Sequence, residues 1–513
     1  MTKKFAVTDV SCLDVSRSTH PISTGIGYLD HMIDQLNSHA QVGVSVTVVV
    51  VDDDREEDDD GDGRGRTRHD RANRYATEDQ SELTSLVGSA LGERLRILLS
   101  TAVDPGSKDG RRSSRFRCPL DEALVECTLA TTTTTSEDDD GGGRLVDFTL
   151  PPYGMYPPDV GRSRIGELET DNVRTFFDSL ARSSGLAMSL RKVRGDNGHH
   201  VVESAFKAFS RALRNLLDGT DAYDARYDPV ANEAAWWGGH SSDAMISGCG
   251  GKTGRTGTVE RSTRETSISV RIRLSDGVPH LDDDDDDDDD GGGATEGDPV
   301  VGVDTGLKTL DRFVSVLARE ARMSVDVRCT GDLYVDDHHT SEDVAIALGQ
   351  ALDEALGTRA GLNRMWCAVG AHGEDSRSIL PVSRNEIFVS IAELVVQTHA
   401  RRPLQTSSFF YIDAEVEVTM DLSNRPHVIH DLFRSTSEEY AGDMSVEMIV
   451  HALESLATNS KSTVHIVERK VGTSALETSL ATAMAYGRAL RMCGAVDPRR
   501  AGTIASSKGT LSV

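Results

Sequence analysis

Two halves of this 513-residue chain repeat the same pattern of segments. The stretch TEDQSELTSLVGSALGERL, which begins at Thr77, resembles SEDVAIALGQALDEAL, which begins at Ser341. Both place apolar residues three and four positions apart, which predicts amphipathic helices. Leu29–Met32 in the first half is similarly matched by Leu310–Phe313 in the second. An internal duplication of about 200 core residues per copy is the economical interpretation.

A stretch near the midpoint separates the two halves. Gly238–Gly257 is rich in Gly and Ser and has no apolar periodicity, which is typical of a linker. The length of the chain allows about two to four domains. We therefore expect a first domain over 1–237, a linker over 238–256 and a second domain over 257–513.

The formal net charge of −28 comes largely from three acidic runs. Low-complexity segments over 51–74, 131–143 and 282–295 contain them, and we expect solvated loop insertions beside strands. Outside these runs the charges are nearly balanced, which argues against a nucleic-acid partner. The chain has no run of apolar residues long enough to span a membrane, so no membrane partner is expected. A further segment, 370–410, has no assigned role.

The seven cysteines are scattered and form no C-x-x-C motif. This spacing indicates reduced thiols in an intracellular protein. The first residues lack the apolar core of a signal peptide. We expect a cytoplasmic location, with a plastid also open.

Two segments, DDHHTSED and GHHVVES, carry a His pair with a Glu four residues after the first His. Each segment precedes an apolar, helix-like stretch. Residues four positions apart lie on one face of a helix. His338 and Glu342 can therefore chelate one cation, and so can His199 and Glu203.

The second His of each pair, His339 or His200, points about 100° away from that chelate. Two such motifs placed face to face would form two metal sites. Each motif would chelate one ion and provide its second His as a ligand to the ion of the other motif. Imidazole and carboxylate ligands without thiolate suit Mn, Fe or Zn, and open six-coordination favours Mn. A single motif is equally typical of an exposed polar helix start; the two copies favour a metal site.

These motifs, together with Ser23–Met32 (STGIGYLDHM), resemble the imidazoleglycerol-phosphate dehydratase family of histidine biosynthesis. The family opens with TGIGFLDHM, and further similar segments cover most of both halves. They are Gly331–Asp343, Asp413–Pro426, Asp443–Leu456, His199–Arg214 and Ser506–Gly509. The resemblance implies an α+β fold, in which each domain is an internally duplicated antiparallel sheet with helices packed on one face.

The two halves depart from the family pattern at complementary positions. The first half has Arg74-Tyr75 in place of His338-His339 and Thr175 in place of His451. The second half changes the positions of His31, His39, His199-His200 and Glu203 to Arg312, Glu320, Leu476-Glu477 and Leu480. Pooled, the halves hold one full ligand set: His31, His199, His200, Glu203, His338, His339, Glu342 and His451.

This complementarity suggests a composite site that forms between neighbouring domains, with two Mn²⁺ ions per site. The resemblance implies that the chain is a hydro-lyase, which dehydrates imidazole glycerol phosphate to imidazole acetol phosphate. The substrate's imidazole must act as electron sink, because no carbonyl is adjacent to the carbon that loses its proton. Glu265 is the candidate proton shuttle, with a surface role as the alternative. His39 is a second catalytic candidate, although core packing is at least as probable.

The phosphate of the substrate requires fixed cationic and hydroxyl donors. Arg425 matches an Arg of the family, and either Arg115 or Arg364 matches a second one; a solvated surface role is open for each. The terminal SSKG motif supplies the remaining candidates: Ser506, Ser507 and Lys508.

The resemblance also implies a homo-oligomer. A family shell of about 24 subunits would need about 12 chains of this fused form, since closed symmetric interfaces must be kept. Two alternatives remain open at this stage. One is a catalytically silent scaffold that co-assembles with an ordinary dehydratase, and the other is a bimetal hydrolase that releases phosphate.

Overall fold

The structure is a computed structural model. It describes residues 5–15, 20–50, 80–101, 112–131, 145–219, 255–274, 299–372, 414–500 and 502–506. The three predicted acidic segments lie outside these ranges apart from Thr131, and the predicted linker does so apart from residues 255–256. Of the extra segment over 370–410, only residues 370–372 are described. These predictions therefore remain predictions.

The first half folds from strands rich in β-branched residues and from helices with an apolar stripe, as its periodicity predicts. Its strands are β1 (Phe5–Leu13), β2 (Ile22–Ser23), β3 (Gly43–Val50), β4 (Ser113–Leu120), β5 (Ala123–Thr131), β6 (Leu145–Thr149), β7 (Arg164–Ile165), β8 (Leu168–Glu169) and β9 (Leu186–Arg194). Its helices are α1 (Gly27–Gln35), the π-helical turn η1 (Leu36–Ala40), α3 (Gln80–Thr101), α4 (Asp171–Ser184) and α5 (Gly198–Asp218).

Among the described residues, the second half repeats this order of elements with one additional strand, β10, at its start. Its strands are β10 (Thr256–Ser262), β11 (Thr266–Leu274), β12 (Val301–Asp304), β13 (Met323–Gly331), β14 (Met365–His372), β15 (Ala414–Asp421), β16 (His427–His430), β17 (Tyr440–Ala441), β18 (Met444–Ser445) and β19 (Thr463–Lys470). Its helices are α7 (Lys308–Glu320), α8 (His338–Leu356), α10 (Val446–Asn459), α11 (Ala475–Gly494) and the 3₁₀ turn η4 (Pro498–Arg500).

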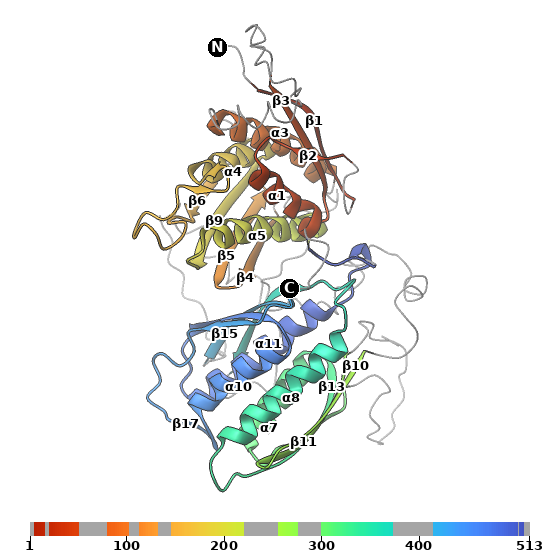
Figure 1. Ribbon diagram of the computed structural model, residues 1–513, viewed down its shortest axis with the longest axis vertical. Coiled ribbons are helices and arrows are strands. Elements are labelled where there is room, and N and C mark those ends of the chain that lie inside the picture. Colours follow the sequence, from red (N-terminus) through yellow and green to blue (C-terminus); the bar gives the residue numbers. More distant parts are fainter. Residues whose placement is uncertain are drawn as a thin grey trace, which may run out of the picture.

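In each half, helices lie between two sheets (Figure 1). The sheet orders are β1-β3-β2 and β4-β5-β9-β6 in the first half, and β10-β11-β13-β12 and β14-β15-β19-β16 in the second. Close helix contacts depend on glycine in both halves. A Cβ at Gly88 of α3 would lie 2.4 Å from the Phe176 carbonyl oxygen of α4, and one at Gly349 of α8 would lie 2.7 Å from the Leu456 carbonyl oxygen of α10. The same packing device in both halves agrees with an internal duplication.

The predicted fold class, α+β with two tandem dehydratase-like domains, is confirmed in its architecture. One detail is corrected, because each of the four larger sheets also contains a parallel pair. These pairs are β2 with β3, β6 with β9, β12 with β13, and β16 with β19. A helix crosses between the two strands of each pair, and such a crossover brings the chain back in the same direction.

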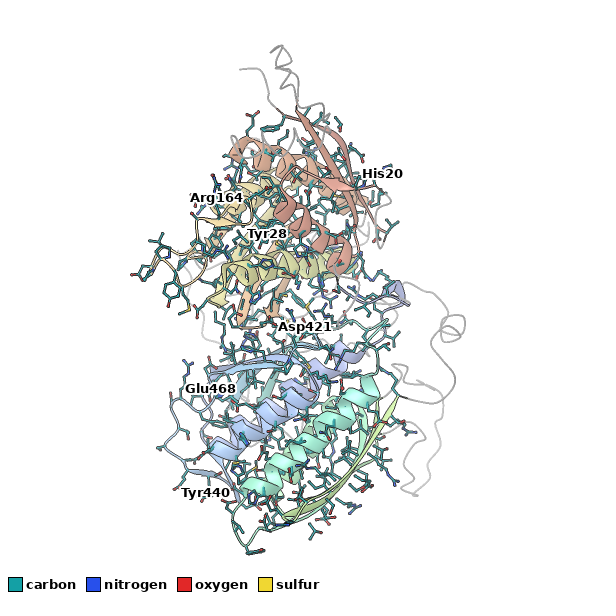
Figure 2. The ribbon with its side chains drawn as sticks, viewed as in Figure 1. His20, Tyr28, Arg164, Asp421, Tyr440 and Glu468 are labelled. Carbon is teal, nitrogen blue, oxygen red and sulfur yellow. The ribbon has the colours of Figure 1, made fainter. Side chains whose placement is uncertain are left out.

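The two halves pack against each other through their inner sheets, with β4 against β14, β15 and β19 (Figure 1). The Phe116 ring meets the Trp366 ring edge-on at a centroid distance of 6.1 Å. Arg117 Nη1 lies 2.6 Å from Glu417 Oε1, and both side chains are buried. Asp421 lies at this junction, as Figure 2 shows. The junction is therefore a packed interface that contains a buried ion pair.

Among the described residues, no helix is both long and apolar enough to cross a membrane.

Candidate metal centre

The first cluster of possible metal ligands consists of His31, His199 and Glu203, and lies where α1 meets the start of α5. One ligand atom from each residue lies within 4.8 Å of the others. His199 Nε2 is 3.1 Å from Glu203 Oε2, as the four-residue spacing on a helix predicts. His31 comes from α1, and its Nε2 is 4.0 Å from the same oxygen. The cluster thus joins a local chelate to a ligand from a distant segment.

The start of α5 is fixed by its cap and by an aromatic neighbour. The Asn197 side chain accepts hydrogen bonds from the backbone N–H groups of His199 and His200. The Tyr28 hydroxyl donates to the His199 carbonyl at 3.2 Å, and its ring meets the His199 ring edge-on. Figure 2 places Tyr28 in the upper half, at α1. The histidine pair is therefore held at a defined position.

The charges around the first cluster favour metal ligation. Burial would raise the pKa of Glu203, but Lys207 and His199 outweigh this effect and lower it well below its usual range. Lys207 Nζ lies 2.8 Å from Glu203 Oε1. Burial also lowers the pKa of His31, so that the neutral imidazole, whose lone pair can bind a metal, is favoured.

The second cluster consists of His338 and Glu342 from α8 and His451 from α10. His338 Nε2 is 3.4 Å from Glu342 Oε2, and His451 Nε2 is 3.2 Å from Glu342 Oε1. The backbone N–H of Ser445, the N-cap of α10, donates to the Asp337 carboxylate at 2.6 Å. This contact ties the starts of the two helices together and so sets the position of the cluster.

His200 and His339 belong to neither cluster among the described residues. Each has a carboxylate on its Nδ1: Glu122 Oε2 is 2.8 Å from His200, and Asp332 Oδ2 is 3.0 Å from His339. A carboxylate on one ring nitrogen orients the ring and leaves the other nitrogen for a metal. Both rings are therefore oriented by a carboxylate on Nδ1, with Nε2 as the nitrogen that could bind a metal.

The donor set of the two clusters is the same. Each has two imidazoles and one carboxylate, and neither includes a thiolate. Such sets suit Mn, Fe or Zn, and three ligands leave room for further ones. The residues of both clusters therefore fit the expected metal.

The second half cannot form a copy of the first cluster, because its matching positions hold residues that are not available as metal ligands. Leu480 of α11 is fully buried and offers no ligand atom. Glu477 pairs instead with His372 Nδ1 at the end of β14. Arg312 occupies α7 where α1 has His31. In the first half, Thr175 lies on α4 and offers only a hydroxyl group.

The two predicted catalytic residues lie in different surroundings. Glu265 lies in the exposed turn between β10 and β11, and its Oε1 is 3.9 Å from His339 Nε2. His39 lies in η1 inside the core, 1% exposed, and neither ring nitrogen has a hydrogen-bond partner within the described part of the chain. Its burial lowers its pKa, and its carbonyl accepts a hydrogen bond from Arg500. This placement supports a packing role for His39.

The predicted phosphate ligands differ in the ion pairs that they form and in their burial. Arg115 pairs with Glu126, whereas Arg364 is buried against Asp421 at 2.7 and 2.8 Å and donates to the Ala505 carbonyl. The Arg425 side chain is 34% exposed, and its Nη1 lies 3.3 Å from Asp121 Oδ2. Ser506 is described, but Ser507 and Lys508 lie outside the described residues.

Three neighbours of these sites were not predicted as functional: Lys207, Glu122 and Asp332. The four-residue spacing from Glu203 to Lys207 is a signal that could have found the first of them. Glu122 and Asp332 contact their histidines from turns, and no helical spacing signals such contacts.

Comparisons with known proteins point to one family. The model of the family described as imidazoleglycerol-phosphate dehydratase matches residues 72–213 and 305–490. The chloroplastic imidazoleglycerol-phosphate dehydratase of Pisum sativum is 33% identical over 258 residues, which cover 50% of this chain and 69% of that protein. The protein of that name from Jannaschia sp. (strain CCS1) is 32% identical over 50% of this chain and 100% of its own length.

The crystal structure of IGPD from Pyrococcus furiosus in complex with (S)-C348 shares 23% identity and a TM-score of 0.32, over 49% of this chain and 99% of that one. The family model matches long segments in both halves of the chain. This chain therefore belongs to the imidazoleglycerol-phosphate dehydratase family, a family of hydro-lyases.

Proposed function

We propose that this chain dehydrates imidazole glycerol phosphate to imidazole acetol phosphate in histidine biosynthesis, at a composite dinuclear site. One observation carries the proposal: each half keeps a different three-ligand cluster, and each cluster draws only on its own half. Decay of a redundant copy would more often leave one half intact and the other without ligands. Two complementary clusters are what a site at a domain interface would preserve.

The composite site joins the first cluster of one chain to the second cluster of another chain. In a single chain, neither cluster includes a described side chain from the opposite half. His339 would complete the first cluster and His200 the second, which gives three His and one Glu per ion. A closed shell of about 12 chains would repeat this junction at every site.

Two Mn²⁺ ions would act there as Lewis acids on the substrate's imidazole ring. The residues of the chain then have separate tasks. Glu265, exposed and 3.9 Å from His339, carries the proton removed from the substrate. Its exposed turn leaves the carboxylate free to reach a substrate bound beside His339.

Arg425 is the Arg that we assign to the substrate phosphate, together with Ser506 and Lys508. Its guanidinium is partly exposed and its backbone is held by Ser423, so that the charge is both accessible and fixed. Arg364 is buried and bonded to Asp421 and Ala505. We assign Arg364 the task of positioning the segment that leads into Ser506, and Arg115 no contact with the phosphate.

A complementation experiment with the full chain tests this proposal. His199→Asn disables the first cluster and His338→Asn disables the second, and each variant alone should be inactive with Mn²⁺. Co-expression of the two should restore about a quarter of the wild-type rate, the random-assembly expectation for sites between chains. His20→Asn, at an exposed position outside both clusters, is the matched control.

Each other outcome has a distinct meaning. Inactive co-assemblies would place the composite site within one chain. A wild-type chain that binds no Mn²⁺ and forms no ketone product would favour a silent scaffold. Phosphate release without ketone would favour a metallohydrolase, and activity in either single variant would overturn the composite site.

A further inference from the structure

A two-residue turn between β4 and β5 connects the second half of the chain to a proposed metal ligand of the first half. Asp121 and Glu122 form this turn, since Leu120 pairs directly with Ala123. Asp121 adopts a φ of +50°, in the left-handed region that few side chains favour. Asp tolerates this region better than most residues, so the sequence is compatible with a two-residue turn here.

On one side, the turn holds the start of α5. Glu122 Oε2 lies 2.8 Å from His200 Nδ1, and Glu122 Oε1 accepts a hydrogen bond from the Asn197 backbone N–H at 3.0 Å. Asn197 is the N-cap of this helix. One carboxylate thus orients both the His200 ring and the residue that begins the helix.

On its other side, the turn is held by the second half. His465 of β19 is fully buried, and its Nε2 donates to the Asp121 carbonyl at 2.7 Å. Arg425 Nη1 lies 3.3 Å from Asp121 Oδ2, and the same oxygen lies 3.7 Å from His200 Nε2. Arg425 therefore balances the charge of the carboxylate nearest to the nitrogen that must bind metal.

We propose that His465 is a positioning residue, which orients His200 for metal binding through the Asp121–Glu122 turn; Arg425, assigned above to the phosphate, also holds this turn through Asp121. Docking of the second half would thereby prepare a ligand that the first half donates to another chain. The inference rests on the proposed composite site and goes beyond it, because it makes one ion depend on the packing of the two halves within a chain.

The orientation of His339, the ligand that the second half donates, does not depend on the packing of the two halves. His339 Nδ1 bonds Asp332, and both residues lie in the second half. Among the described residues, the Asp332 side chain makes no contact with the first half. We therefore expect the ion completed by His200 to respond to changes at the interface, and the ion completed by His339 not to respond.

The test measures Mn²⁺ alone, by equilibrium dialysis against the full-length chain. His465→Leu removes the N–H donor, and His465→Gln keeps an amide N–H at a similar reach. Loss of such an outer contact weakens metal binding by about 10- to 100-fold. We expect one of the two Mn²⁺ dissociation constants to rise by that factor in His465→Leu while the other stays unchanged, and both to stay within about threefold of wild type in His465→Gln.

Two further variants keep the test decisive if His465→Leu does not fold. Asp121→Asn keeps the turn, because Asn tolerates the left-handed region, but removes the charge that Arg425 meets. Asp121→Asn should raise the dissociation constant of the same Mn²⁺ ion that His465→Leu affects. Arg499→Ala removes a different contact between the halves, with Asp218, and should bind both ions as wild type does.

The outcomes are distinguishable. His465→Leu and Asp121→Asn chains that fold and bind both ions with wild-type affinity would overturn the inference and leave the proposed function standing. A lowered melting temperature with unchanged Mn²⁺ affinity would assign His465 to stability alone. A wild-type chain that does not bind two Mn²⁺ ions would overturn the proposed function itself.

Discussion

Lys207 Nζ lies 2.8 Å from Glu203 Oε1, one turn further along α5, and both side chains are at least nine-tenths buried. The carboxylate of a proposed metal ligand is thus neutralised from within its own helix. His199 approaches the other carboxylate oxygen at 3.1 Å. The first cluster is therefore organised before any ion binds, since each oxygen of Glu203 already has a partner.

This pair gives a prediction about stability. Lys207→Met keeps the length of the side chain but leaves a buried carboxylate without its cation, which should cost about 3 kcal/mol of unfolding free energy. Mn²⁺ should offset more of this loss than it adds to wild type, because the ion replaces the missing charge. Urea unfolding with chelator and with Mn²⁺ measures both effects.

Arg182→Met is the matched control for that prediction. It breaks an exposed pair of the same four-residue spacing, with Asp178, and should cost less than about 0.5 kcal/mol. Equal losses of unfolding free energy in Lys207→Met and Arg182→Met would show that burial of the Lys207 pair does not increase its contribution to stability.

The proposed proton carrier gives a kinetic prediction. Glu265→Gln should lower kcat by about a hundredfold to ten-thousandfold, while the Mn²⁺ content stays at the wild-type level, since Glu265 is proposed to move a proton and not to bind the ion. Steady-state assays and metal analysis of the same samples measure this. Glu260→Gln, on the adjacent strand β10, should retain wild-type kcat. A Glu265→Gln chain with normal kcat would assign that residue to the surface.

The buried ion pair between the halves gives a third prediction. Glu417 is fully buried and faces Arg117 at 2.6 Å and Arg469. Glu417→Gln removes this charge and should destabilise the chain by about 3 kcal/mol, because the buried Arg117 guanidinium then keeps only Glu126 as a counter-ion. Arg499→Ala breaks an exposed pair at the same interface and should cost less than about 1 kcal/mol. Chemical denaturation of the two variants compares these losses, and a smaller loss at Glu417 would contradict the expected order.

His465 gives a prediction about pH. Its burial lowers its pKa from 6.5 to about 3, with Arg194 and His427 acting in the same direction and the contact with Asp121 opposing them. The folded pKa is depressed, so the unfolded chain takes up the proton first as the pH falls below 6.5. Stability is therefore unaffected above pH 6.5 and is lost progressively between pH 6.5 and 3. At pH 5 the loss is about 2 kcal/mol.

His465→Gln removes this titration and keeps the hydrogen bond. The unfolding free energy of the wild type, relative to this variant, should fall by about 2 kcal/mol between pH 7.5 and 5. Denaturant unfolding at the two pH values provides the comparison. A constant difference would mean that the ring does not titrate between the folded and unfolded states.

Much of the fold followed from sequence periodicity. The apolar stripes predicted the helices that became α3 and α8, and the matching segments predicted two similar halves. The four-residue spacings in α5 and α8 placed His199 beside Glu203 and His338 beside Glu342. These features were predictable because side-chain positions on a helix depend only on its local geometry. The parallel edge pairs were missed, since they depend on which way each crossover helix returns.

The sequence by itself determined the complementary inventory of ligands, because the residue types at matching positions can be read directly. Only the tertiary structure decided which distant groups join the local chelates. His31 reaches Glu203 across more than 160 residues, and His465 reaches Asp121 from the opposite half. It also decided that Arg364 is buried in an ion pair while Arg425 is partly exposed. Such contacts arise from the packing of sheets and helices remote in sequence, and no local spacing encodes them.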